Sequence, residues 1–272
     1  MKNNNVGVFP RRERGSSRPQ SITIKAYAKL NLFLDILGKR PDGYHEILTK
    51  MCTIDLSNEV TITIGETGII SENNKNAYKA ADLFLNKINS KENVKLNINK
   101  NIPEQAGLGS SSADSAAVLR GLNTFYGAPF TLDEIMNIGA EVGSDVPFCI
   151  HGGCAVCSGT GIEISEILPL PDCVFVIVKP EFSFSTKDAY ARFIGRADPA
   201  PATQFYNIFE ELHNHPEIDK IKQELIAQGA SAALMTGSGS AVFGVFENPQ
   251  NAEKALKNLN FGEKFIAKPL KF

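Results

Sequence analysis

The sequence of 272 residues lacks any apolar run long enough to cross a membrane, and its first residues lack the apolar segment of a signal peptide. A charge excess is also missing, because 28 basic and 30 acidic residues give a net charge of −2. That balance does not favour nucleic acid or an anionic membrane surface as a partner. With 43% apolar residues and no internal repeat, we expect a globular cytoplasmic protein with one large domain or two moderate ones.

Cysteine is sparse, and its five residues are an odd number, which indicates free thiols in a reducing compartment rather than a disulfide framework. Cys149, His151, Cys154 and Cys157 lie close together, so a zinc site is an alternative. However, C-x-x-C occurs once, without a second pair at zinc-finger spacing, and strand-like residues separate its two cysteines. Residues three apart on a strand face opposite sides of a sheet. We therefore expect buried thiols rather than a metal site.

The two commonest phosphate-binding patterns are missing as well: no lysine follows Gly109, as a P-loop requires, and residues 101–117 contain no G-x-G-x-x-G. This stretch does contain a proline turn, the glycines Gly107 and Gly109, three consecutive serines and then an apolar helical run. Such an order indicates a small-residue loop at the N-terminus of a helix, where backbone N–H groups and the helix dipole favour a phosphate. The alternative is an ordinary serine cap on a core helix.

Four other short segments contain groups that suit phosphoryl chemistry; they are residues 28–31, 40–45, 143–147 and 236–240. Lys29 can neutralise a phosphate or hold a reacting hydroxyl, and Asp145 can accept the proton of a hydroxyl. Tyr44 and His45 follow a Pro-Asp-Gly turn and can stack on a base and hydrogen-bond to it. The glycines of the last segment can close over phosphates. Each segment also has a plain structural alternative: a solvated lysine, a hairpin turn, a capping aspartate and a hairpin loop, respectively.

Hydrophobic periodicity predicts strands and helices that are mixed without strict β–α alternation, which favours an α+β fold. The predicted strands are residues 21–28, 30–37, 46–54, 59–64, 94–99, 152–158, 161–164, 173–178, 232–235, 241–246 and 264–268. The predicted helices are residues 76–89, 111–126, 131–142, 185–193, 203–212, 218–227 and 251–258. Strand alternation directs Lys29 and Asn31 to one face. Thr131 and Glu134 are spaced as a capping box.

Two segments lack this periodicity. Residues 1–20 are polar, basic and rich in Arg, Asn and Ser, which predicts a disordered tail; an organelle transit peptide is the alternative. Residues 195–203 are polar and contain proline, so we expect a mobile connection inside the second half of the chain rather than a domain boundary.

Taken together and in this order, the phosphate loop and the four segments resemble the GHMP small-molecule kinase superfamily over residues 24–268. The turn with Tyr44 and His45 resembles one branch of it, which acts in the non-mevalonate route to isoprenoids on an alcohol that carries a cytidylyl group. The phosphate loop alone fits any GHMP kinase. The family loop usually reads P-x-G-A-G-L-x-G-G-S-S-D-A-A. Here Gln105, Ser110 and Ser111 replace glycines, and Ala113 replaces a serine.

The resemblance implies a two-domain α+β GHMP kinase fold, with residues 21–165 and 166–272 as its domains and the active site in the cleft between them. It implies transfer of the γ-phosphoryl group of ATP to a hydroxyl, with Asp145 as the general base and Lys29 orienting the hydroxyl and neutralising charge. Mg2+ would bridge ATP oxygens with one of Ser110, Ser111 and Ser112. The residues that would contact ATP are Pro103, Glu104, Gln105, Ala106, Gly107, Leu108, Gly109, Ser110, Ser111, Ser112 and Ala113.

The resemblance also implies the contacts of the alcohol substrate, with Tyr44 and His45 holding the cytosine ring. The implied substrate-binding residues are Asn31, Tyr44, His45, Phe182, Phe184, Gly237, Ser238 and Gly239. Two alternatives stay open: a different GHMP kinase, acting on homoserine, mevalonate or a sugar, and a non-catalytic nucleotide-binding regulator. We expect no nucleic-acid or membrane partner, and a monomer or homodimer.

Overall fold

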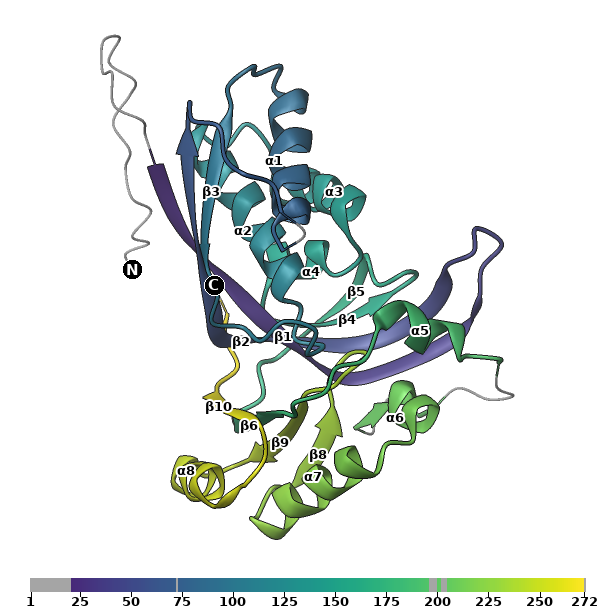
Figure 1. Ribbon diagram of the computed structural model, residues 1–272. Helices are drawn as coiled ribbons and strands as arrows, with labels where there is room; N and C mark the ends of the chain where they lie inside the picture. Colours follow the sequence, from purple (N-terminus) through teal and green to yellow (C-terminus); the bar gives the residue numbers. More distant parts are fainter. Residues whose placement is uncertain (1–20, 72, 196–199, 202–204, 272) are drawn as a thin grey trace.

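The computed structural model describes residues 21–71, 73–195, 200–201 and 205–271. The predicted tail at residues 1–20 and most of the predicted connection at residues 195–203 lie outside these ranges. The described chain forms two β-sheets, one of six strands and one of four, and helices cover each of them (Figure 1). This mixture of strands and helices confirms the predicted α+β class.

The larger sheet is built around two long strands, β1 (Ser21–Lys39) and β2 (His45–Ile64), which form an antiparallel hairpin. Its other strands are β3 (Val94–Asn99), β4 (Cys154–Ser158), β5 (Glu163–Leu168) and the short β7 (Tyr206–Asn207). The strand order is β5-β4-β2-β1-β7, and β3 pairs with the second half of β2.

The sequence predicts two strands in place of each long one, and this prediction is wrong. β1 continues through Lys29, which pairs with Thr53 of β2. The register of the pairing shifts before Lys29 and again after Asn31, but the strand does not end at either shift. β2 continues in the same way through residues 57 and 58, which pair with Tyr27 and Ala26. The two long strands extend from the helices α1 to α4 toward the part of the molecule that contains the smaller sheet (Figure 1).

Helices α1 (Lys75–Lys87), α2 (Ser110–Phe125), α3 (Leu132–Val142) and α4 (Val146–His151) form a layer beside the larger sheet (Figure 1). The capping box of α3 is confirmed: the Thr131 hydroxyl accepts from the N–H of Glu134, and the Glu134 carboxylate accepts from the N–H of Thr131. Helix α4 was not predicted. Its six residues are too few and too uniformly apolar to show a helical period.

The smaller sheet has the order β10-β6-β9-β8. Its strands are β6 (Val174–Lys179), β8 (Ala232–Met235), β9 (Val242–Phe246) and β10 (Glu263–Ala267). The helices of this part are α5 (Thr186–Ala191), α6 (Ile208–His213), α7 (Pro216–Ala227) and α8 (Pro249–Asn258).

The helix predicted over residues 203–212 is wrong at its start, part of which lies outside the described residues. Helix α6 begins only at Ile208, because Asn207 caps it by accepting from the N–H of Phe209 at 3.0 Å. Residues 206–207 pair instead with Phe33 and Leu34 of β1. An Asn cap inside an apolar run thus ends the helix earlier than the periodicity indicates.

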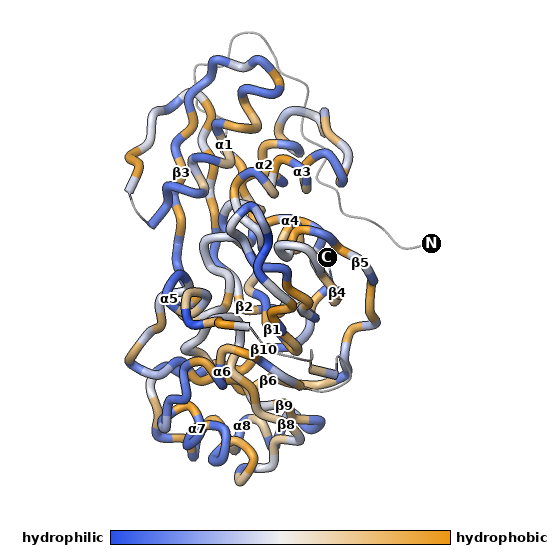
Figure 2. The backbone as a smooth tube through the Cα atoms, turned by 90° about the vertical axis from the view of Figure 1, so that its right-hand side faces the viewer, coloured by the Kyte–Doolittle hydropathy of each residue, from blue (hydrophilic) through white to orange (hydrophobic). Residues whose placement is uncertain are grey.

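The two central strands of the smaller sheet, β6 and β9, are buried on both faces. Every residue of β6 is buried, as its apolar run predicts. Phe175 and Ile177 belong to a core that continues into the larger sheet, whereas Val176 and Val178 belong to a second core that includes residues of α6, α7 and α8. Apolar and polar residues alternate along α1 and α7 (Figure 2), since one side of each helix is buried.

Strand β5 runs through residue 165, which the resemblance to GHMP kinases implies as the end of the first domain. Because β5 pairs with β4 as far as Leu168, it belongs wholly to the larger sheet. We therefore propose that the division falls in residues 169–173. Strand β7 and an isolated bridge between Ile54 and Pro269 then join the second part back to the larger sheet.

Candidate active site

A cavity of about 1170 Å³ lies between the two parts of the chain and is lined by residues of both, as predicted. The predicted site residues that line it are Lys29, Asn31, Tyr44, His45, Pro103, Glu104, Gln105, Ala106, Gly107, Leu108, Gly109, Ser110, Ser111, Ser112, Asp145, Phe184, Gly237, Ser238 and Gly239. Two others do not line it. Ala113 is buried in the core, and the ring of Phe182 stacks on His215 with 4.2 Å between centroids.

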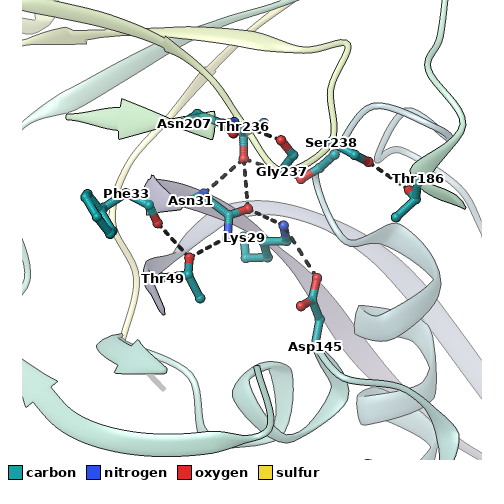
Figure 3. Close-up of polar contacts among 11 residues, drawn as sticks. Lys29, Asn31, Phe33, Thr49, Asp145, Thr186, Asn207, Thr236, Gly237 and Ser238 are labelled. Atoms are coloured by element: carbon teal, nitrogen blue, oxygen red, sulfur yellow. Dashed lines mark hydrogen bonds and ion pairs between the residues drawn. The ribbon is translucent and has the colours of Figure 1, made fainter. Parts of the chain in front are cut away.

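Lys29 joins Asn31 and Asp145 on the cavity wall (Figure 3). Its Nζ lies 2.5 Å from Asn31 Oδ1 and 3.5 Å from Asp145 Oδ2. Lys29 and Asn31 share one face of β1, whereas Asp145 precedes α4. The side chain of Lys29 is 4% exposed and that of Asp145 is 34% exposed. The ammonium is therefore buried in the wall, and the carboxylate is accessible from the cavity.

The loop before α2 requires glycine at two positions. Gly107 and Gly109 have φ of +75° and +76°, in the left-handed region that favours glycine. A Cβ at Gly107 would lie 2.0 Å from the carbonyl oxygen of Thr236, and one at Gly109 would lie 3.1 Å from Cγ of Lys29. The glycines thus allow this loop to lie directly against the β8–β9 loop and the lysine. The N–H of Lys29 also donates to the carbonyl of Leu108 at 3.0 Å.

Two of the departures from the family loop, Ser110 and Ser111, have a structural explanation. The third, Gln105, has none: its φ of +51° lies in the left-handed region that favours glycine. Ser110 and Ser111 lie in the first turn of α2, where their hydroxyls accept from the Nδ2 groups of Asn58 and Asn76, each at 3.1 Å. Amide side chains therefore hold both added hydroxyls.

Asn58, which is fully buried on β2, joins the two ends of this loop. Its Oδ1 accepts from the N–H groups of Asn101 and Ile102, both at 2.8 Å. Its Nδ2 donates to Ser110 Oγ at 3.1 Å and to Asp114 Oδ1 at 2.8 Å. One side chain therefore fixes both the entry to the loop and the first turns of α2.

Asp114 is a buried carboxylate beneath the loop. Its Oδ2 lies 2.7 Å from Nζ of Lys100, which is also 3.3 Å from a carboxylate oxygen of Glu104. The pKa of Asp114 is raised, because the effect of burial exceeds the opposite effect of the hydrogen bonds from Lys100 and Asn58. Lys100 and Glu104 line the cavity, so this ion-pair set belongs to its wall.

The turn between β1 and β2 presents two rings at the cavity. Tyr44 is 63% exposed, and His45 stacks on Tyr190 of α5 with 5.1 Å between ring centroids. Burial, and then the charge of Lys39, lower the pKa of His45, which favours the neutral imidazole. Tyr190 also lines the cavity. It was not predicted as a site residue, because an aromatic residue in a short helical segment is usually a core residue.

A second aromatic stack holds the β8–β9 loop. Phe184 lies flat on His213, with 3.7 Å between centroids. The Nε2–H of His213 donates to the carbonyl of Ser238 at 3.1 Å, and its buried Nδ1 has no partner among the described residues. Burial is the main cause that lowers the pKa of His213. The hydroxyls of Ser238 and Thr186 lie 2.7 Å apart, so the loop is also tied to the start of α5.

Two buried threonines complete the contacts around Asn31 (Figure 3). Thr49 Oγ1 donates to the carbonyl of Phe33 at 2.7 Å and accepts from Asn31 Nδ2 at 2.8 Å. Thr236 Oγ1 accepts from the N–H of Asn31 at 2.9 Å. Neither was predicted as a site residue, since threonine is common in strands and the sequence does not indicate what its hydroxyl faces.

The cysteine thiols make none of the side-chain hydrogen bonds given above for the cavity wall, although the N–H of Cys149 donates to the carbonyl of Asp145 at 3.0 Å. Cys149, Cys154 and Cys157 are buried free thiols, and burial is the main cause that raises the pKa of Cys157 to about 12. His151 Nδ1–H donates to the carbonyl of Gly152 at 2.7 Å. Within the part of the chain that the structure describes, no group of three or more His, Cys, Asp or Glu is arranged to hold a metal ion.

None of the described helices has the length and apolar character needed to cross a membrane.

Comparison with known proteins relates this geometry to a family. The GHMP kinases N terminal domain matches residues 75–153, and the GHMP kinases C terminal domain matches residues 211–263. A curated relative from Clostridium tetani is 39% identical and covers 91% of this chain and 99% of its own. Another from Brevibacillus brevis is 40% identical and covers 83% and 88%, respectively. The chain belongs to the GHMP kinase family.

Both relatives are named 4-diphosphocytidyl-2-C-methyl-D-erythritol kinase. A crystal structure of 4-(cytidine 5'-diphospho)-2C-methyl-D-erythritol kinase matches with a TM-score of 0.78 at 29% identity, over 90% of this chain and 98% of that one. A homoserine kinase from Cytophaga hutchinsonii has a TM-score of 0.72 at 17% identity, so it shares the fold alone. The expected two-domain GHMP kinase fold is confirmed.

Proposed function

We propose that this protein transfers the γ-phosphoryl group of ATP to the 2-hydroxyl of 4-diphosphocytidyl-2-C-methyl-D-erythritol, in the cytoplasm, as a step of non-mevalonate isoprenoid biosynthesis. The main support is the pair of Lys29 and Asp145, 3.5 Å apart on a cavity wall between a glycine–serine loop and an aromatic turn. The names of relatives at 39% and 40% identity support the choice of substrate.

Asp145 takes the proton of the substrate hydroxyl, since its carboxylate is accessible from the cavity. Lys29 orients that hydroxyl and neutralises the charge that develops on the transferred group. Phosphoryl transfer passes through a loose transition state, so positioning and charge stabilisation supply most of the acceleration. A buried lysine fixed against Asn31 suits this role, because it does not have to reorganise during the reaction.

ATP binds with its phosphates on the loop before α2. The supporting observation is the order of elements there: a left-handed glycine, Gly109, is the N-cap of a helix that has no side-chain cap among the described residues, and first-turn N–H groups can bind an anion. Mg2+ accompanies ATP, and one of Ser110, Ser111 and Ser112 would hold it. Hydroxyl and phosphate oxygens are the hard ligands that Mg2+ prefers, and the bound ion supplies charge neutralisation at the phosphates.

The cytosine ring binds at the β1–β2 turn. Tyr44 is exposed there, and the neutral imidazole of His45 is held by its stack on Tyr190. An imidazole fixed in this way presents one hydrogen-bonding nitrogen to a base edge, while the exposed ring offers a stacking surface. Phe184, which faces the same cavity, is a further candidate contact, whereas Phe182 is not.

A coupled ADP-release assay tests this function. With ATP and 4-diphosphocytidyl-2-C-methyl-D-erythritol we expect sustained ADP release, and with homoserine, mevalonate or galactose none above background. Preference for one of the other alcohols would replace the proposed substrate. ATP binding without ADP release for any of them would favour a nucleotide-binding regulator.

A further inference from the structure

The amide of Asn31 must present its oxygen, not its nitrogen, to Lys29. Asn31 Oδ1 lies 2.5 Å from Lys29 Nζ, and an ammonium group only donates hydrogen bonds. If the amide were turned by half a rotation, its NH2 group would face the ammonium, and two donors would meet in a buried place. The orientation of one amide therefore decides whether Lys29 has a partner on this side.

Thr49 holds the nitrogen side of this amide, while the Thr236 hydroxyl, 3.5 Å from Asn31 Oδ1, is a longer contact on the oxygen side. Thr49 is 1% exposed and lies on β2, paired with Leu34 of β1. Its hydroxyl has one proton, which it donates to the carbonyl of Phe33 at 2.7 Å. A carbonyl can only accept, so the Thr49 oxygen can offer Asn31 nothing but lone pairs. Asn31 must then turn its Nδ2 group toward Thr49, which is the observed contact of 2.8 Å (Figure 3).

We propose that Thr49 is a positioning residue for phosphoryl transfer: by fixing the amide of Asn31, it holds the ammonium of Lys29 toward Asp145. This inference rests on the proposed function. Thr49 lines the cavity beside Asn31, and its hydrogen bonds connect it to Asp145 through Asn31 and Lys29, along a chain of contacts at 2.8, 2.5 and 3.5 Å. The chain is buried as far as Lys29, so water does not readily substitute for a missing partner.

The same strand offers a matched control. Thr53 is also buried on β2, four residues after Thr49, and pairs with Lys29 itself. Its Oγ1 has no hydrogen-bond partner among the described residues. Thr49→Val and Thr53→Val therefore make the same chemical change in the same strand, but only the first removes a contact of Asn31.

Thr49→Val is expected to lower kcat about tenfold, the equivalent of about 1.4 kcal/mol, with little change in the KM for ATP. Thr49→Ser keeps the hydroxyl and should recover most of the activity. Thr53→Val should match the wild type. If valine lowers the yield of folded protein, Thr49→Ala provides the same loss of the hydroxyl, and melting temperatures show which variants are folded.

A second readout does not depend on turnover. Acetic anhydride acylates accessible amines, and peptide mass spectrometry measures the rate at Lys29. We expect faster labelling of Lys29 in Thr49→Val than in the wild type and in Thr53→Val, because the ammonium has lost a fixed partner. Equal labelling in all three proteins overturns the inference, as does an equal loss of kcat in both valine variants. Absence of ADP release from the wild type would refute the proposed function, while the labelling would still test the role of Thr49.

Discussion

Lys29 is a buried cation, and burial of a charge is costly unless other groups compensate for it. Asn31 and Asp145 provide oxygens on two sides of its ammonium. The aliphatic part of its side chain lies against Gly109, where any Cβ would come within 3.1 Å. The residue is thus held in one place before ATP arrives, which is the condition for stabilising charge without reorganisation.

Tyr44 and His45, at the turn between β1 and β2, should determine the affinity for the alcohol rather than for ATP. Tyr44→Ala and His45→Ala are expected to raise the KM for the cytidylyl substrate much more than the KM for ATP. Loss of one stacked ring costs about 1–3 kcal/mol, which corresponds to about 5–160-fold. Steady-state kinetics with each substrate varied in turn measures both constants.

Leu37→Ala is the control for these variants, since Leu37 is an exposed apolar residue at the end of β1 that does not line the cavity. Its two KM values should stay at the wild-type level. Equal increases for ATP and for the alcohol in Tyr44→Ala would argue against a cytosine site at this turn.

Individual residues could be predicted from the sequence where the chemistry of one side chain is distinctive. Lys29 and Asp145 were singled out as charged groups in otherwise apolar or small-residue surroundings, and the resemblance to GHMP kinases assigned them as a pair; both line the cavity. Thr49 and Asn58 could not be found in this way. Their importance depends on which groups the folded chain places beside them, and their residue types are ordinary in strands and turns.

At the scale of elements, the phosphate loop is a segment whose two ends are fixed by β2. The four hydrogen bonds of Asn58 connect residues 101 and 102 to the first turns of α2. Asn58→Leu should therefore raise the dissociation constant for ATP at least about tenfold and lower the free energy of unfolding by about 2–3 kcal/mol, because buried partners lose their hydrogen bonds. Isothermal titration with ATP and urea unfolding measure the two effects.

Asn99→Leu makes the same change at an exposed position of the neighbouring β3 and should affect neither quantity. If Asn58→Leu binds ATP as tightly as the wild type, the loop keeps its shape without this side chain.

Element boundaries were predicted less well than element types, for physical reasons. Alternation predicted the faces of β1, but the register shifts around Lys29 depend on pairing with β2, which local sequence does not determine. Helix α4 is short, and β7 is a two-residue pairing that exists only because the second part of the chain returns to β1. The capping box of α3 depends on residues three apart, so it could be predicted.

For the whole molecule, the cavity exists because the two parts pack through one continuous core and touch through two loops. The N–H of Ala241 donates to the carbonyl of Ala106 at 3.1 Å, and Gly107 lies against Thr236. The stack of Phe184 on His213 supports the β8–β9 loop from the other side. A change in the charge of His213 should therefore change the free energy of unfolding of the protein.

The pH dependence of stability tests this support. Burial lowers the pKa of His213 below 6.5, so the unfolded chain binds more protons than the folded one as the pH falls through about 6.5. Folding stability should be at its full value above that pH and should decrease below it. Urea unfolding between pH 7.5 and 5.5 is expected to show a steeper loss in the wild type than in His213→Gln, which cannot titrate at this position. Parallel pH profiles would show that His213 does not contribute.

The kcat of Asp145→Asn tests the central claim most directly. Asparagine keeps the shape of the side chain but cannot take a proton, so we expect kcat to fall at least ~10²-fold while the melting temperature stays close to that of the wild type. Asp133→Asn, at an exposed position of α3, should retain full activity and serves as the control. Turnover near the wild-type rate in folded Asp145→Asn would contradict the account.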